Sequence, residues 1–174
     1  MGIFSGADDT SGSRTSLYIA PGEYIARIDG FKTGKTRKKR DFVVIETTIL
    51  AVTRQDVDST TEQPCSNKVR TSPSHMIMMD SDTGLPNVIA AIRDITGVED
   101  GDVTEAKLVQ LAGDEQPLQG WIVRVNAFEI TTQAGKPFTK IEYRGLVSVA
   151  DLEAAGLSPD DLKDGDTILE TLGA

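Results

Sequence analysis

FKTGKTRKKRDFVVIETTIL, residues 31–50, places a cluster of cations directly before a run of β-branched residues. The β-branched run predicts a strand at 42–52, because Val, Ile and Thr pack well on a pleated surface. Apolar and polar residues alternate at 23–31, which predicts another strand. The cations between these strands are six of the chain's 18 Lys and Arg residues: Lys32, Lys35, Arg37, Lys38, Lys39 and Arg40. Residues 32–40 are called the basic loop below.

The basic loop contrasts in charge with the rest of the chain. The whole chain of 174 residues has a formal net charge of −9, so the remainder without the loop's +6 carries −15. This balance argues against indiscriminate binding to nucleic acid or anionic membranes. It still allows one local site, because salt screens charges more than about 8–10 Å apart. Lys and Arg at this density suit phosphate contacts, and the alternative is a solvated charge run at a hairpin tip.

The remaining segments predict a mainly β domain. Further strands are predicted at 68–79, 121–131 and 138–147. Between the third and fourth strands, helical spacing from Leu85 to Ile95 predicts a helix that ends at Gly97. A shorter helix is predicted at 104–111, with Thr104 as its N-cap. This order is typical of the five-stranded Greek-key barrel called the OB fold, with a helix between strands three and four. In that fold, nucleic acid lies between the loops joining strands one and two and strands four and five.

Gly135 predicts the pairing of the last two strands. A three-residue hairpin loop commonly ends with Gly in the left-handed region, and that loop sets Val125 opposite Tyr143 on a core face shared with Trp121. The opposite face mixes aromatic and charged side chains, in the pairs Ile130–Phe138, Phe128–Lys140, Asn126–Glu142 and Arg124–Arg144.

A nucleic-acid interface is predicted from these elements. Proteins that bind single strands without sequence preference combine a cationic groove with aromatic side chains on which bases stack. The basic loop supplies the first cations, the face of strands two and three completes the site, and Phe128 and Phe138 supply stacking or instead pack under the C-terminal segment. Further cations extend the track: Arg124, Lys136, Lys140 and Arg144. Phe31 and Phe42 bracket the loop, and the sequence leaves open which of them is buried.

The sequence shows no pattern typical of an enzyme, a metal site or a cofactor site, and we expect none of these. His75 is the only histidine and Cys65 the only cysteine, too few for a zinc cluster. Gly34-Lys35-Thr36 resembles the end of a phosphate-binding loop, but Asp29 stands where that motif requires glycine. A single cysteine favours a reducing compartment, so we expect a cytoplasmic protein. No apolar run approaches the ~18 residues of a membrane span, and no membrane partner is expected.

Several short motifs resemble those of small bacteriophage single-stranded DNA-binding proteins with an OB fold. They are Pro21-Gly22-Glu23-Tyr24, the loop before Phe42-Val43-Val44-Ile45-Glu46, the helix after Leu85, and Gly120-Trp121-Ile122-Val123 with Gly135-Lys136-Pro137-Phe138. The resemblance covers residues 17–147. It implies a viral protein that binds single-stranded DNA during phage DNA replication or recombination in the host cytoplasm. Such proteins often end in an acidic tail with an apolar tip, to which residues 168–174 bear only a loose likeness.

Three segments are predicted: a flexible leader at 1–16, an OB-fold domain at 17–148 and an acidic tail at 149–174 with a short helix at 150–156. The tail is a solvated end, a segment that binds replication or recombination proteins, or an internal mimic of DNA that covers the basic groove.

Besides single-strand binding, a second hypothesis for the function of the whole protein is a phage virion protein whose β-barrel packs against neighbouring subunits. A third is an inhibitor or adaptor that acts through its acidic surface. The sequence leaves open whether the chain forms a homo-oligomer and whether it prefers DNA to RNA.

Overall fold

The computed structural model describes residues 18–145 and 148–158. Its elements in chain order are β1 (Gly22–Lys35), β2 (Asp41–Gln55), β3 (Ser74–Met78), α1 (Gly84–Thr96), the 3₁₀ helix η1 (Asp100–Asp102), α2 (Glu105–Leu111), β4 (Ile122–Thr131), β5 (Pro137–Arg144) and α3 (Val149–Ala154). The third strand is shorter than predicted, because it begins after Pro73, which has no N–H to donate to a ladder. The predicted leader and the part of the predicted tail after residue 158 lie outside the described residues.

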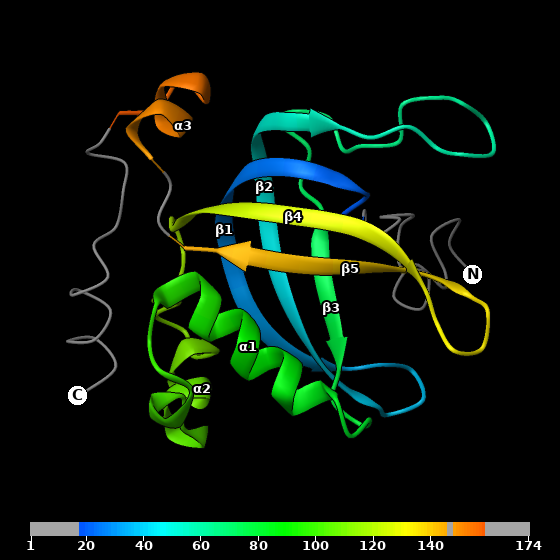
Figure 1. Cartoon of the computed structure of the whole chain (residues 1–174). Helices are drawn as coiled ribbons and strands as arrows, with labels where there is room; N and C mark the ends of the chain where they lie inside the picture. The colour runs from blue at the N-terminus through cyan, green and yellow to red at the C-terminus, as the bar shows by residue number, and fades with distance from the viewer. Residues whose placement is uncertain (1–17, 146–147, 159–174) are drawn as a thin grey trace, which may run out of the picture.

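The strands form one antiparallel sheet of five strands in the order β3-β2-β1-β4-β5. The sheet is strongly curved, with α1 and α2 at one end and α3 at the other (Figure 1). Among the described residues no backbone ladder joins β3 to β5, so the sheet does not close into a barrel by strand pairing. Instead, a side-chain hydrogen bond joins His75 of β3 to Tyr143 of β5. The gap between these two edge strands is called the seam below.

The hydrophobic core lies between the inner face of the sheet and α1. The buried face of α1 includes Val88, Ile92 and Ile95. Burial of each such aliphatic side chain stabilises the fold by about 1.5–3 kcal/mol. Trp121, predicted for the core face, is 4% exposed. The predicted helix end is also confirmed, because Gly97 takes a left-handed φ of 74° after α1.

A bulge in β1 changes which residues face the core. In the first half of the strand, Tyr24 and Ile28 are buried, both at even positions. The register with β2 then shifts between Ile28 and Gly30, which inserts one extra residue into β1. After the shift, odd-numbered Phe31 is buried and Lys32 is exposed. The bulge therefore places Phe31 in the core and turns Lys32 toward solvent.

Helix α3 covers part of the outer face of the sheet. Leu152 is fully buried and belongs to a second, smaller core with Ile25 of β1 and Ile122 of β4. Ser148 and Asp151 form a capping box that stabilises the start of this helix. The short helix predicted for the start of the acidic tail is thus present and packs against the sheet. No helix within residues 18–145 and 148–158 is long and apolar enough to cross a lipid bilayer.

Candidate nucleic-acid interface

The basic loop is mostly part of a long β-hairpin. β1 and β2 stay paired as far as Lys35 and Asp41, so the turn itself comprises only residues 36–40. Within the turn, the Lys39 N–H donates to the Thr36 carbonyl at 2.8 Å, and Lys39 adopts a left-handed φ of 59°. The cations therefore lie on an ordered hairpin backbone and not on a long irregular loop.

Two strand cations of the hairpin are paired with carboxylates. Lys32 Nζ lies 2.8 Å from Glu46 Oε2, and Lys35 Nζ lies 2.6 Å from Asp41 Oδ1. All four side chains are more than a third exposed, so water screens these pairs and they contribute little to stability. Their main effect is to reduce the charge that β1 presents to a ligand.

The turn cations differ in their partners. Arg40 contacts both carboxylate oxygens of Asp80, just after β3, and this guanidinium holds the pKa of Asp80 below its ordinary value. Lys38 and Lys39 are exposed and form no ion pair with any residue of the described ranges. Three of the six cations of the basic loop are therefore paired with acids: Lys32, Lys35 and Arg40. Lys38 and Lys39 are thus the cations most available for phosphate groups.

An apolar surface lies beside these cations, on the outer face of β2 and β3. Phe42 and Val44 of β2 lie opposite Met78 and Met76 of β3, and all four side chains are half-buried. The Phe42 ring lies so close to Gly34 that a Cβ at Gly34 would stand 2.6 Å from Phe42 Cζ. Phe42 is therefore the surface aromatic of the two that bracket the basic loop. This set of four residues is called the outer patch below.

The β4–β5 hairpin has the predicted register. Its pairs run without a shift from Arg124–Arg144 to Ile130–Phe138, and Gly135 takes the expected left-handed φ of 75°. Phe138 is 55% exposed. Phe128 is half-buried, and Lys140 Nζ lies 5.7 Å from its ring centroid, close enough for a cation–π contact. Of the two predicted stacking residues, Phe138 presents the larger free surface.

The predicted interface residues fall into three groups. The first is the basic loop, and the second is Phe128, Lys136, Phe138 and Lys140, toward the tip of the β4–β5 hairpin. Both hairpin turns project toward the same side of the view in Figure 1. Arg124 and Arg144 form the third group at the other end of that hairpin, where Arg124 Nε lies 3.9 Å from Oδ2 of Asp151 in α3. The structure therefore does not bring Arg124 together with the turn cations.

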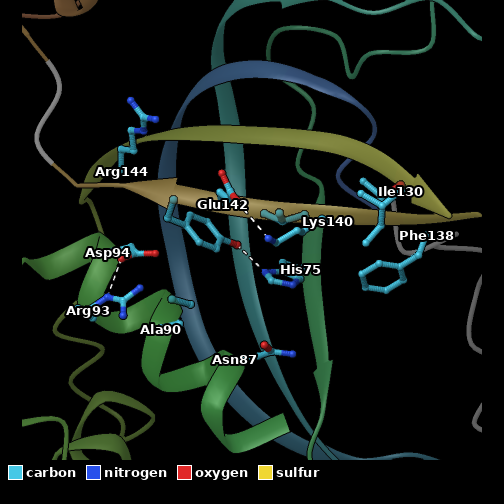
Figure 2. A pocket seen from close by; sticks show the side chains of 14 residues that line it. His75, Asn87, Ala90, Arg93, Asp94, Ile130, Phe138, Lys140, Glu142 and Arg144 are labelled. Carbon is cyan, nitrogen blue, oxygen red and sulfur yellow. Dashed lines mark hydrogen bonds and ion pairs between the residues drawn. The ribbon is translucent and has the colours of Figure 1, made fainter. Parts of the chain in front are cut away.

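A cavity of about 640 Å³ lies along the seam, between β5 and α1 (Figure 2). In its wall, His75 Nδ1 lies 2.8 Å from Tyr143 Oη, and the two rings stack with centroids 5.7 Å apart. Burial lowers the pKa of His75 to about 4 and raises the pKa of Tyr143, so the imidazole is neutral at neutral pH. Asn87 of α1 and Phe138 of β5 also line the cavity.

A second cavity of about 840 Å³ lies between α1, α2 and the hairpin ends of β1 and β2. Its lining is largely apolar and includes Phe31 and Val88 from the core. Leu85 and Val109, which also line it, are 48% and 67% exposed. An apolar groove with exposed aliphatic residues is typical of a surface that contacts another protein.

The described residues include no group of three or more His, Cys, Asp or Glu side chains placed to hold a metal ion. The chain matches no model of a known protein family, and a search of curated proteins finds no match.

Proposed function

We propose that this protein binds single-stranded DNA without strong sequence preference, through a barrel of the OB type. The strand order β3-β2-β1-β4-β5, with helices between β3 and β4, supports an OB-type arrangement. The absence of a β3–β5 ladder among the described residues is the departure from a closed barrel.

The observation that carries the proposal is the position of Lys38 and Lys39 beside the outer patch. These cations have no ion-pair partner among the described residues and are three to four residues from Phe42 along the chain. A positively charged track next to aromatic and apolar side chains is the combination that binds single strands. The cations neutralise phosphates, and Phe42 supplies a surface for base stacking.

The second hairpin extends this interface. Phe138 offers another exposed ring, and Lys136 and Lys140 lie on either side of it in sequence. A strand that crosses the outer patch from the β1–β2 turn toward the β4–β5 turn meets cations and an aromatic ring at both ends. Because short motifs of the sequence resemble those of phage single-stranded DNA-binding proteins, we propose that the protein acts in phage DNA replication or recombination in the host cytoplasm.

The test is fluorescence anisotropy of a labelled oligo-dT, titrated with the protein at several salt concentrations. Each phosphate neutralised on a single strand contributes about −0.7 to the log–log salt slope. The double variant Lys38→Ala/Lys39→Ala is therefore expected to bind more weakly, with a slope flatter by about 1.4. The matched control, Lys68→Ala/Lys107→Ala, changes the net charge equally at positions away from the hairpin and is expected to retain the slope. Absence of binding at low salt would overturn the proposal.

A second candidate function is a phage virion protein that packs against neighbouring subunits. It is favoured by the apolar cavity between α1 and α2, where Leu85 and Val109 are exposed. A virion subunit co-sediments with phage particles and does not require affinity for free oligonucleotides. Sedimentation of particles and the anisotropy titration therefore separate the two functions.

A further inference from the structure

We infer that the seam between β3 and β5 takes up one unstacked base of the bound strand. This inference rests on the proposed function and adds a base-binding pocket to it. The pocket is the cavity between β5 and α1. The volume of this cavity, about 640 Å³, lies within the range of about 300–1,000 Å³ that is usual for small-ligand sites. The exposed ring of Phe138 lines the pocket, so the pocket is continuous with the surface along which the strand is proposed to run.

The walls of the pocket suit a nucleic-acid base. Ala90 of α1 and Ile141 of β5 provide apolar surface, and Asn87 provides an amide that can both donate and accept hydrogen bonds. Figure 2 shows Asn87 and Ala90 on the α1 side of the cavity, opposite β5. His75 is held by Tyr143 and is neutral, because burial lowers its pKa to about 4. A neutral base therefore meets no buried charge at this wall.

The free edge of β5 adds backbone donors and acceptors. Thr132 N–H donates to the Lys136 carbonyl at 2.9 Å, and the register continues without a shift along the hairpin. Hydrogen-bonded and non-hydrogen-bonded pairs alternate in an antiparallel ladder. The backbone groups of Thr139 and Ile141 therefore point away from β4, toward the seam. The edge of a base carries donors and acceptors that can bind such groups.

Cations at the rim suit the phosphates on either side of the inserted base. Lys140 and Arg144 both line the cavity. Lys140 also pairs with Glu142 at 3.3 Å, whereas Arg144 has no ion pair with any residue of the described ranges. Arg93 and Asp94 at the α1 rim pair with each other, so the three cations and two acids of the rim leave a net charge of +1.

The test follows the ring resonances of His75 by NMR, which are unambiguous because the sequence has one histidine. The probes are an oligo-dT of about eight nucleotides, within the usual site size of one OB fold, and an abasic oligomer with the same number of phosphates. The oligo-dT is expected to shift both the His75 ring resonances and the backbone amides of Lys38 and Lys39. The abasic oligomer is expected to shift only the two amides.

Variants of α1 complete the experiment. Ala90→Phe places an aromatic ring in the pocket and is expected to reduce the His75 shift strongly, to retain the Lys38 and Lys39 shifts and to weaken oligo-dT binding about fivefold or more. Asn87→Ala, which adds no bulk, is expected to reduce the His75 shift, and Ala106→Phe, at an exposed position of α2, is the matched control.

The outcomes separate the two proposals. Base insertion is overturned if oligo-dT shifts the Lys38 and Lys39 amides but not the His75 resonances. It is also overturned if both oligomers shift the His75 resonances equally. Either result leaves single-strand binding intact. If neither the hairpin amides nor His75 respond to oligo-dT, single-strand binding fails and base insertion fails with it.

Discussion

The side chain of Gln116 forms both backbone hydrogen bonds that a neighbouring strand would otherwise give to Phe31. Its Oε1 accepts from the Phe31 N–H at 2.8 Å, and its Nε2 donates to the Phe31 carbonyl at 3.0 Å. The ladder between β1 and β4 ends at Arg27, so this edge of β1 lacks a strand partner at Phe31. Gln116 thus supports β1 at the point where it continues into the basic hairpin.

Gln116→Ala is expected to destabilise the protein. The substitution leaves a backbone donor and an acceptor at the buried Phe31 without their partner, which costs about 1–3 kcal/mol for an unsatisfied group. Urea denaturation measures the change as a lower midpoint at an unchanged slope. Gln133→Ala, in the exposed β4–β5 turn, is the control, and equal stability of the two variants would contradict the role of Gln116.

Stability is expected to fall as the pH drops from about 6.5 to about 4, in part because of His75. Burial lowers the folded-state pKa of His75 to about 4 from its ordinary value of 6.5. In this window the unfolded chain binds the proton and the folded chain does not, so acid favours unfolding. The contribution is on the order of 3 kcal/mol at most.

The measurement for His75 is urea denaturation of the parent and of His75→Gln, each at neutral pH and at about pH 4.5, between the folded and unfolded pKa values. Carboxylates titrate in both proteins, so the difference between them reports the histidine. The variant is expected to lose less stability than the parent on acidification. Equal losses would show that His75 does not contribute.

Leu152→Ala tests whether α3 belongs to the folded domain. Leu152 is fully buried with Ile25 and Ile122, and truncation of a buried leucine costs about 2–5 kcal/mol. Val149→Ala in the same helix, at a position that is 58% exposed, is expected to change stability by no more than about 0.5 kcal/mol. Thermal or urea unfolding of the pair gives the answer, and a neutral Leu152→Ala would mean that α3 detaches readily in solution.

Phe42→Ala is expected to weaken oligo-dT binding through the loss of a stacking surface. Loss of one base–aromatic stack costs about 1–3 kcal/mol, which corresponds to a decrease in affinity of about fivefold to 150-fold. Anisotropy measures the affinity, and the salt slope is expected to stay the same because no charge changes. Val109→Ala removes an exposed apolar side chain from α2 and should bind as the parent does. An unchanged affinity for Phe42→Ala would exclude the outer patch as the stacking surface.

Local sequence signals predicted some features of this chain correctly. The register of β4 and β5 follows from the glycine at position 135 and from simple alternation, since no bulge interrupts either strand. The N-cap at Thr104, whose side chain accepts from the Lys107 N–H, also depends only on neighbouring residues. In both cases the residues that fix the structure lie within a few positions of each other.

Other features depend on partners far away in the chain. The bulge between Ile28 and Gly30 changes the facing of the second half of β1, and no local motif marks it. Because the sequence does not reveal this bulge, neither the burial of Phe31 nor the pairing of Lys32 with Glu46 could be predicted from the sequence. For the same reason the outer patch was predicted only as a face of two strands, and its methionines were not named.

The seam also affects the rate of folding and the local opening of the sheet. His75 and Tyr143 are 68 residues apart in sequence, and contacts between such distant residues form slowly, because a long loop must close first. Amides of β1 that lie between β2 and β4 exchange with solvent only when much of the sheet opens. Those of Thr139 and Ile141, on the free edge of β5, exchange without breaking a ladder. Hydrogen exchange is therefore expected to begin at the two edge strands, β3 and β5, which face each other across the seam, while the centre of the sheet stays folded.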